Sequence, residues 1–502
     1  MNASSSMQAL ATPQAAASWL QQHITGTLRS DSRHVRRGDG FMAWPGAATD
    51  ARRYVADVLA EGAAACLVEA EGAHAYDWRD ARVATYAGLK RDAAPIAAAY
   101  FEQPSAHLTV LAVTGTNGKT STAWWLAQAL SRLGQRCAVV GTLGIGEPGA
   151  LVFNGLTTPD PVIFQQALRR LVDEAYTACA LEASSIGLAE HRLDATKVHT
   201  AIFTNFTQDH LDYHGTMQAY WAAKAKLFDW PGLKTAVILI DDAHGLDLAE
   251  KLKTRDLDLW TVSATGPARL RADAIRYGLN TVRFEVHEGQ TVCQIQAPVV
   301  GSYNVANLLG VIAALRSLGL PLQKIADSCS GLTPVPGRME TLAIEGRPLA
   351  VIDYAHTPDA LAKVLQALRP LAHQRGGRLC CVFGCGGDRD ASKRPLMAAA
   401  AAAGADHLMI TSDNPRSEDA GAIIADILTG LPAPASAQVQ ADRAIAIATA
   451  LQQAGAQDVV LIAGKGHENY QEIRGQKLPF SDRALAEAAL ASYTAQVSGA
   501  GA

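Results

Sequence analysis

Short apolar runs alternate with longer helix-like stretches over most of this 502-residue chain. Between residues 108 and 335 the runs predict buried strands at Leu108–Val113, Cys137–Gly141, Ala178–Glu182, Thr200–Thr204 and Ala236–Ile240. Strands that alternate with helices are typical of a mostly parallel sheet covered by helices. Two further runs, Thr281–Val286 and Thr291–Ile295, flank a polar turn and predict a hairpin added to that sheet.

The same alternation of strand-like and helix-like stretches occurs on both sides of this region. Beyond a Pro- and Gly-containing hinge at Pro334–Gly337, four runs predict a doubly wound sheet: Leu349–Asp353, Arg378–Phe383, His407–Thr411 and Asp458–Ala463. The alanine-rich run Ala398–Ala403 follows a helical pattern there and predicts a packed helix. Nearer the N-terminus, Ala65–Glu69 predicts a strand and Ala81–Phe101 a helix, which indicates a small α/β unit.

These patterns predict an α/β protein of three domains, which the chain length also favours. Residues 1–107 would form a small N-terminal α/β domain. Residues 108–336 would form a central P-loop ATPase-like domain with a mostly parallel sheet, and residues 337–502 a C-terminal doubly wound, Rossmann-like domain.

Composition excludes several classes of partner. The net charge is -4 and the pI about 6.4, so the chain has no basic field for a nucleic acid or an anionic membrane. Met1–Gln22 has no Lys or Arg before its apolar residues, and no window approaches a membrane span, so we expect a soluble, cytoplasmic monomer. The eight scattered cysteines should be reduced and buried, and Cys381 with Cys385 lacks the partners of a zinc site.

The clearest chemical signal is a glycine-bounded loop after the run Val110–Val113. In such a loop Gly115 and Gly118 let backbone N–H groups face phosphates, Lys119 reaches the β- and γ-phosphates, and the Thr120 hydroxyl can bind Mg²⁺. The helix-like stretch Ala123–Leu133 follows, as this mechanism requires. The glycines stand two residues closer than in the usual P-loop, which argues against a switch or transport ATPase. An ordinary Gly-rich turn is the alternative.

Four segments together resemble the Mur ligases of peptidoglycan precursor synthesis, and the resemblance covers nearly the whole chain. They are Thr114–Thr120, Glu182–Gly187, Asn205–Asp212 and Asp353–Leu361. Within that family, Gly384–Asp390, Asp413–Arg416 and Gly464–Glu468 resemble the third ligase. The resemblance implies that the chain adds meso-diaminopimelate to UDP-N-acetylmuramoyl-L-alanyl-D-glutamate. ATP would phosphorylate the glutamate side-chain carboxylate, and the amine would then displace phosphate.

The resemblance also implies a catalytic and metal-binding set. Lys119, Glu182, His210 and a carbamylated Lys224 would be catalytic, and Mg²⁺ would be held by Thr120, Glu182, His210 and Lys224. ATP would contact Gly115, Thr116, Asn117, Gly118, Lys119, Thr120, Ser121, Asn304 with its neighbour Asn307, Arg338 and Asp353. From the residues alone, Lys224 reads as a solvated surface lysine. His210 could be a core histidine, but Asp209 and Asp212 beside it make a polar turn that favours metal binding.

Substrate contacts follow from the same resemblance. Those for the UDP-muramoyl dipeptide are Ser30, Ser32, the loop Gly46–Thr49, Thr157, Thr158, Ser184 and Arg192. Leu156, Ile186 and Glu190 depart from the family pattern, so side-chain bonds there cannot be carried over. The residues implied to contact diaminopimelate are Arg389, Asp413, Asn414, Pro415, Arg416, Gly464 and Glu468.

Three alternatives remain open. The chain could be the lysine-adding ligase of the same family, although the Arg416 cation suits the additional carboxylate of diaminopimelate. It could be a folylpolyglutamate synthetase, which shares the P-loop and domain plan. It could also be a catalytically dead ATP-binding scaffold, although Lys119, Glu182, His210 and Lys224 are all retained.

Overall fold

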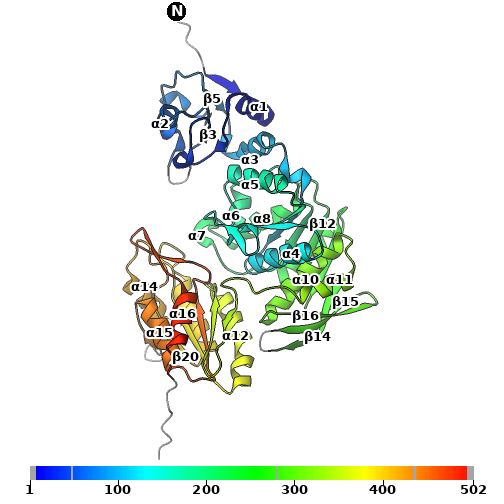
Figure 1. Cartoon of the computed structure of the whole chain (residues 1–502), viewed down its shortest axis with the longest axis vertical. Helices are drawn as coiled ribbons and strands as arrows, with labels where there is room; N and C mark the ends of the chain where they lie inside the picture. The colour runs from blue at the N-terminus through cyan, green and yellow to red at the C-terminus, as the bar shows by residue number, and fades with distance from the viewer. Residues whose placement is uncertain (1–6, 47–48, 279–280, 434–436, 495–502) are drawn as a thin grey trace, which may run out of the picture.

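A computed structural model describes residues 7–46, 49–278, 281–433 and 437–494. Figure 1 shows three lobes that follow one another along the longest axis, from the blue N-terminal lobe through the green central lobe to the yellow and red C-terminal lobe. Each lobe is built on its own sheet. No helix within these ranges is long and apolar enough to cross a membrane.

The N-terminal sheet is parallel throughout, with strand order β1-β5-β4-β3-β2. Its strands are β1 (Gln8–Leu10), β2 (Leu28–Arg29), β3 (Gly40–Ala43), β4 (Ala65–Glu69) and β5 (Val83–Tyr86). The helices are α1 (Pro13–His23), α2 (Val55–Ala60) and α3 (Leu89–Tyr100), with 3₁₀ turns η1 (Ser32–His34), η2 (Ala51–Tyr54), η3 (Ala73–Ala75) and η4 (Pro104–His107).

The prediction of one helix over Ala81–Phe101 was wrong in its first part. Val83–Tyr86 is a strand that pairs with β4 on one side and β1 on the other. Gly88, with a φ of 77°, then starts α3. The many alanines of Ala81–Phe101 favour a helix, so the short strand was not recognised. The burial of that strand depends on neighbouring strands that are distant in sequence.

The central sheet has strand order β16-β15-β14-β13-β12-β11-β6-β10-β7-β8-β9. Its strands are β6 (Thr109–Thr114), β7 (Cys137–Gly141), β8 (Gly144–Glu147), β9 (Ala150–Val152), β10 (Ala178–Glu182), β11 (Thr200–Phe203), β12 (Thr235–Leu239), β13 (Asp258–Ser263), β14 (Leu270–Tyr277), β15 (Val282–Glu288) and β16 (Thr291–Ala297). The strands from β14 to β7 in this order are parallel, and antiparallel strands extend both edges. The predicted hairpin is confirmed as β15 and β16.

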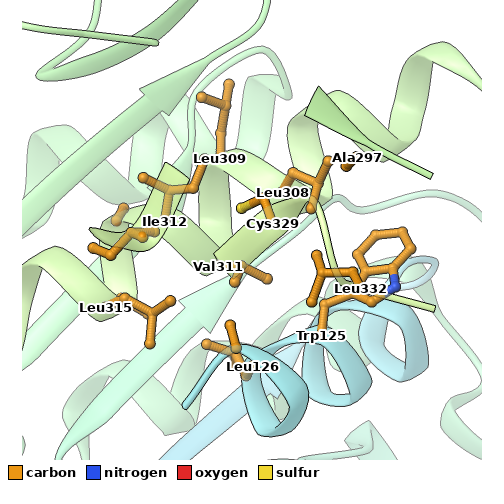
Figure 2. Close-up of a cluster of buried hydrophobic side chains, with 14 of the residues drawn as sticks. Trp125, Leu126, Ala297, Leu308, Leu309, Val311, Ile312, Leu315, Cys329 and Leu332 are labelled. Carbon is orange, nitrogen blue, oxygen red and sulfur yellow. The ribbon is translucent and has the colours of Figure 1, made fainter. Parts of the chain in front are cut away.

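Helices cover both faces of the central sheet. They are α4 (Lys119–Arg132), α5 (Pro161–Asp173), α6 (Ser185–Ala189), α7 (Leu211–His214), α8 (Met217–Ala225), the 3₁₀ turn η5 (Lys226–Asp229), α9 (Ala243–Leu252), α10 (Ser302–Ser317) and α11 (Leu322–Cys329). Figure 2 shows Leu126 of α4 facing Val311 of α10, with Trp125 of α4 beside Leu332. This packing fixes the start of α4, where the glycine loop ends.

The C-terminal sheet has order β17-β18-β22-β19-β20-β21, parallel except for the edge strand β17. Its strands are β17 (Glu340–Leu342), β18 (Leu349–Asp353), β19 (Leu379–Phe383), β20 (His407–Ile410), β21 (Ala437–Val439) and β22 (Val459–Ala463), with a separate hairpin β23 (Tyr470–Ile473) and β24 (Gln476–Pro479). Helices α12 (Pro358–Arg375), α13 (Lys393–Gly404) and α14 (Ala420–Leu428) cover one face, and α15 (Arg443–Gln453) and α16 (Asp482–Ala491) the other.

The sequence-predicted fold class, α/β with a doubly wound C-terminal sheet, is confirmed. The alanine-rich run Ala398–Ala403 lies in α13, as predicted. The predicted cysteine environment also holds, because all eight thiols are free and buried. The three sheets lie within residues 8–86, 109–297 and 340–463, whereas the domain boundaries themselves stay a prediction.

Arg443 and Asp482 form a fully buried ion pair that joins α15 to α16, with an N–O distance of 2.7 Å. Removing one partner leaves the other charge buried without compensation. We therefore expect Asp482→Ala to lower the free energy of unfolding by about 3–5 kcal/mol in urea denaturation. Glu487→Ala, which removes an exposed partner of Arg483 in the same helix, should cost less than about 1 kcal/mol. Equal losses in the two variants would contradict this expectation.

Candidate functional site

The glycine loop lies at the carboxyl end of β6 and leads directly into α4. Gly115 and Gly118 have φ values of 148° and 87°. A Cβ at Gly115 would lie 1.9 Å from Thr204 Oγ1, and one at Gly118 would lie 2.4 Å from Asn307 Oδ1. Both positions therefore require glycine, and the loop packs against β11 on one side and α10 on the other.

Two lysines converge on one carbonyl of this loop. Lys119 Nζ donates to Gly115 O at 2.9 Å and to Thr116 O at 2.8 Å. Lys224 Nζ donates to the same Gly115 O at 2.7 Å. Burial lowers the pKa of Lys119, as does the charge of Arg338, while Glu182 and Asp209 oppose that shift. The loop thus gathers two buried amines where phosphates are predicted to bind.

Glu182 is fully buried at the end of β10. Its Oε2 accepts from Thr120 Oγ1 at 2.9 Å, and its Oε1 accepts from Thr142 N at 2.8 Å. Gly141 makes room for this carboxylate, because a Cβ there would lie 2.1 Å from Glu182 Oε1. The hydroxyl and carboxylate oxygens lie together and are hard ligands, so Thr120 and Glu182 fit Mg²⁺.

The interpretation of Lys224 as a solvated surface lysine was wrong. Its side chain is 1% exposed near the end of α8, and Nζ lies 4.5 Å from the centre of the Tyr220 ring. Burial, together with the neighbouring Lys119 charge, holds the pKa of Lys224 well below that of an ordinary lysine. Lys226, two residues later, is exposed. The structure therefore selects Lys224 as the unusual lysine.

His210 has a φ of 53° and precedes α7. Its Nε2 lies 3.5 Å from Asp209 Oδ2, and its ring meets the Tyr220 ring edge-on at 6.0 Å. Burial lowers the pKa of His210, although Asp209 opposes the shift. Within the described residues no group of three or more His, Cys, Asp or Glu is arranged to hold a metal. Thr120 and Glu182 are thus brought together, whereas His210 pairs with Asp209.

Of the residues predicted on the far side of ATP, Asn307 and Arg338 reach the loop. Asn307 Nδ2 donates to Asn304 Oδ1 at 2.9 Å, and Asn307 packs on Gly118. Arg338 Nη2 lies 3.3 Å from Thr120 Oγ1, while Asp353 accepts the backbone N–H of Met339 at 2.7 Å. Ser121 is buried in the first turn of α4. Residues before and after the hinge therefore meet at one loop.

Three further residues hold this loop, and the sequence-based set did not include them. Asn205 Oδ1 accepts from Asn117 N at 2.9 Å, and Asp359 Oδ2 accepts from Asn117 Nδ2 at 3.2 Å. The third residue, Thr142, acts through Glu182: it donates to the Glu182 carboxylate, which in turn accepts from Thr120. Thr142 and Asn205 stand one or two residues after a buried strand, which is a recognisable signal for a site. Asp359 comes from the C-terminal domain, and its sequence carries no such signal.

Four residues predicted to bind the muramoyl dipeptide lie together. Thr157 Oγ1 is 3.0 Å from Thr142 Oγ1, and Thr158 Oγ1 is 2.9 Å from Ser184 Oγ. Arg192 Nη1 donates to Thr158 O at 2.9 Å. Of the residues that depart from the family pattern, Leu156 is 45% exposed, Ile186 is half-buried in α6, and Glu190 pairs with Lys90 of α3 at 2.7 Å.

At the nucleotide-sugar end, Ser30 Oγ donates to Asp160 Oδ1 of the central domain at 2.7 Å. Ser32 begins η1. Ala47 and Ala48 of the predicted loop Gly46–Thr49 lie outside the described residues. Ser30 therefore lies at the junction between the first two domains.

The predicted amino-acid pocket lies where β19, β20 and β22 end. Asn414 Nδ2 donates to Glu468 Oε2 at 2.8 Å, and a Cβ at Gly464 would lie 2.5 Å from Asp413 Oδ2. Arg416, with a φ of 56°, donates from Nη1 to Gly387 O at 2.6 Å and lies 3.7 Å from Glu472.

The other two predicted residues are Pro415 and Arg389. A Cβ at Gly387 would lie 2.0 Å from Pro415 O, so the two loops pack tightly. Arg389 is exposed and donates to Asp388 O at 3.0 Å. The structure thus brings Asn414 and Glu468 into contact, whereas Arg389 extends into solvent.

Comparison with known proteins gives the family of this chain. Residues 113–315 match the Mur ligase middle domain, and residues 337–466 match the Mur ligase glutamate ligase domain. The chain belongs to the Mur ligase family. A Mur ligase relative from Acidovorax sp. (strain JS42), UDP-N-acetylmuramoyl-L-alanyl-D-glutamate--2,6-diaminopimelate ligase, is 57% identical over 97% of this chain and 98% of its own.

Solved structures of Mur ligases are also similar. One of a UDP-N-acetylmuramoyl-L-alanyl-D-glutamate--2,6-diaminopimelate ligase shares 36% identity with a TM-score of 0.64, over 93% of this chain and 94% of that one. MurF ligase from Thermotoga maritima in complex with ADP shares the fold at 18% identity, with a TM-score of 0.63 over 88% of this chain and 94% of that one.

Proposed function

We propose that this Mur ligase adds meso-diaminopimelate to the D-glutamate side-chain carboxylate of UDP-N-acetylmuramoyl-L-alanyl-D-glutamate, with ATP converted to ADP and phosphate. The name of the 57%-identical relative supports this reaction. The structural observation that carries the proposal is the Asn414–Glu468 contact beside Arg416, since it combines an anionic and a cationic group at the strand ends of the C-terminal domain.

The first half-reaction would occur at the glycine loop. Lys119 would move from its own loop carbonyls to the β- and γ-phosphates, where its charge stabilises the transferring phosphoryl group. Thr120 and Glu182 would hold Mg²⁺, which when bound neutralises phosphate charge. A carbamylated Lys224 and His210 would serve a second Mg²⁺. The substrate carboxylate would take the γ-phosphoryl group and become an acyl phosphate.

The second half-reaction joins the amine to that acyl phosphate. The amine would attack the carbonyl carbon, phosphate would leave, and the amine would lose a proton. Water must be excluded, because it would hydrolyse the same intermediate. Asn117–Asp359 and Arg338–Thr120 already connect the loop to residues beyond the hinge, so closure of the C-terminal domain on the loop would begin from existing contacts.

Phosphate release by the purified protein tests the reaction. We expect release only when ATP, Mg²⁺, UDP-muramoyl dipeptide and meso-diaminopimelate are all present. Turnover with lysine equal to that with diaminopimelate would identify the lysine-adding ligase instead. Turnover with a folate and glutamate would identify a folylpolyglutamate synthetase. A folded protein without turnover on any of these substrates would be a dead scaffold.

Arg416→Ala should lower kcat/KM for meso-diaminopimelate by roughly 30-fold or more, because loss of a buried charge-assisted pair typically costs about 2 kcal/mol or more. The affinities for ATP and the UDP-substrate should not change. Arg416→Lys should recover only part of the loss, since an ammonium cannot form a bidentate fork with the far carboxylate. The measurement is initial rate against diaminopimelate concentration.

Arg474→Ala is the matched control, because Arg474 is exposed and also has a left-handed φ, 50°. Its kinetics should match those of the wild type. If Arg416→Ala kept the wild-type preference for diaminopimelate over lysine, the proposal that Arg416 determines amino-acid specificity would be wrong.

A further inference from the structure

The amino-acid pocket contains a buried lysine to which the proposed reaction gives no role. Lys465 lies between Gly464 and Glu468 after β22, and its side chain is 0% exposed. Nζ donates to Asn414 Oδ1 at 2.9 Å and to Glu468 Oε2 at 2.7 Å. Both of its partners are residues expected to contact diaminopimelate. A fully buried ammonium is costly, so these bonds compensate its burial.

The two oxygens of Glu468 are used unequally. Lys465 Nζ and Asn414 Nδ2 both donate to Oε2, at 2.7 and 2.8 Å. Neither bond uses Oε1. Two donors on one oxygen fix the rotamer of the carboxylate, while the other oxygen keeps its capacity to accept. Oε1 can therefore receive the far ammonium of the substrate without breaking the existing bonds.

Lys465 also determines how the Asn414 amide is oriented. Asn414 Oδ1 accepts from Lys465 Nζ at 2.9 Å and from Glu472 N at 2.9 Å. An ammonium has no acceptor, so the amide must turn its oxygen toward Lys465 and its nitrogen toward Glu468. The rings of Tyr470 and Phe480 lie 5.5 and 6.0 Å from Nζ and favour a cation there.

We propose that Lys465 is a positioning residue that holds Glu468 in one place and so makes the pocket select the meso isomer of diaminopimelate over the LL isomer. The inference rests on the proposed function. With the far carboxylate on Arg416, the configuration of the far carbon decides where its ammonium points. A Glu468 carboxylate fixed by Lys465 and Asn414 can accept the ammonium from only one configuration of the far carbon. A mobile Glu468 could move to accept the ammonium of either isomer.

Kinetics of Lys465→Met test this role. We expect KM for meso-diaminopimelate to rise about 10-fold or more, as for loss of a charged hydrogen bond, and the preference for the meso over the LL isomer to fall by a similar factor. KM for ATP and for the UDP-substrate should not change. Lys477→Met is the control, since Lys477 is exposed and lies over the Tyr470 ring at 4.3 Å from the opposite hairpin strand. A folded Lys465→Met protein with wild-type KM and isomer preference would overturn the inference.

A double-mutant comparison separates positioning from general structural support. If Lys465 acts through Glu468, adding Lys465→Met to Glu468→Gln should raise KM for diaminopimelate no further. Additive increases would overturn the inference. If Lys465→Met alone does not fold, the double variant can still be measured against Glu468→Gln, because it lacks the Glu468 charge that Lys465→Met would leave unpaired. Wild-type protein without diaminopimelate turnover would overturn the proposed function and this inference together.

Discussion

Lys119→Ala is expected to lower the rate of phosphate release by about 100- to 1,000-fold, the usual loss when one preorganised charge is removed from a transition state. Among the described residues, Lys119 Nζ bonds two carbonyls of its own loop, Gly115 O and Thr116 O. The lost ammonium therefore contributes to the reaction more than to packing. The measurement is kcat at saturating substrates, with the thermal unfolding midpoint recorded for the same protein.

The unfolding midpoint should stay close to that of the wild type. Lys251→Ala, which removes an exposed lysine of α9 in the same domain, should retain wild-type kcat. Wild-type turnover by Lys119→Ala would falsify the assignment of the glycine loop to ATP phosphates.

Lys224→Ala should lose about 100-fold or more of the activity and regain part of it in acetate, which can occupy the space of the missing carboxylate. The lowered pKa of Lys224 leaves its amine neutral at a lower pH than an ordinary lysine. A neutral amine can attack carbon dioxide, forming an N–C bond and releasing a proton. The resulting carbamate is an anion that binds Mg²⁺, whereas an ammonium would repel it.

Carbon-13 NMR in labelled bicarbonate measures this modification. Wild type should show a carbamate signal that Lys224→Ala lacks. Lys226→Ala is the control, because Lys226 is exposed two residues away, and it should keep both the signal and the activity. Full activity of a bicarbonate-depleted wild type without a carbamate signal would exclude the modified lysine as a functional group.

Most of the strands that were predicted from the sequence match the structure to within one residue at each end, because continuous apolar runs in parallel sheets are buried on both faces. Cys137–Gly141, Ala178–Glu182 and Leu349–Asp353 match the structure at both ends. The glycine loop and Glu182 could be placed for the same reason, since the loop directly follows such a run and Glu182 is the last residue of another.

Features that depend on docking could not be predicted in this way. The burial of Lys224 comes from α8 packing against the loop, and this contact between segments distant in sequence is not part of the local pattern of α8. Family resemblance, and not periodicity, selected Lys224. The bonds from Ser30 to Asp160 and from Asn117 to Asp359 join separate domains, and nothing local in the sequence predicts them.

The Asn117–Asp359 bond has a thermodynamic consequence. Asn117 belongs to the loop that is predicted to seat the nucleotide, and α12, which carries Asp359, belongs to the domain that holds the predicted amino-acid pocket. A nucleotide that displaced or tightened this bond would bias the position of that domain. Two ligands that bias the same interdomain equilibrium share one coupling free energy. If ATP raises the affinity for the amino acid by some factor, the amino acid must raise the affinity for ATP by the same factor, so the two substrates would saturate this ligase cooperatively.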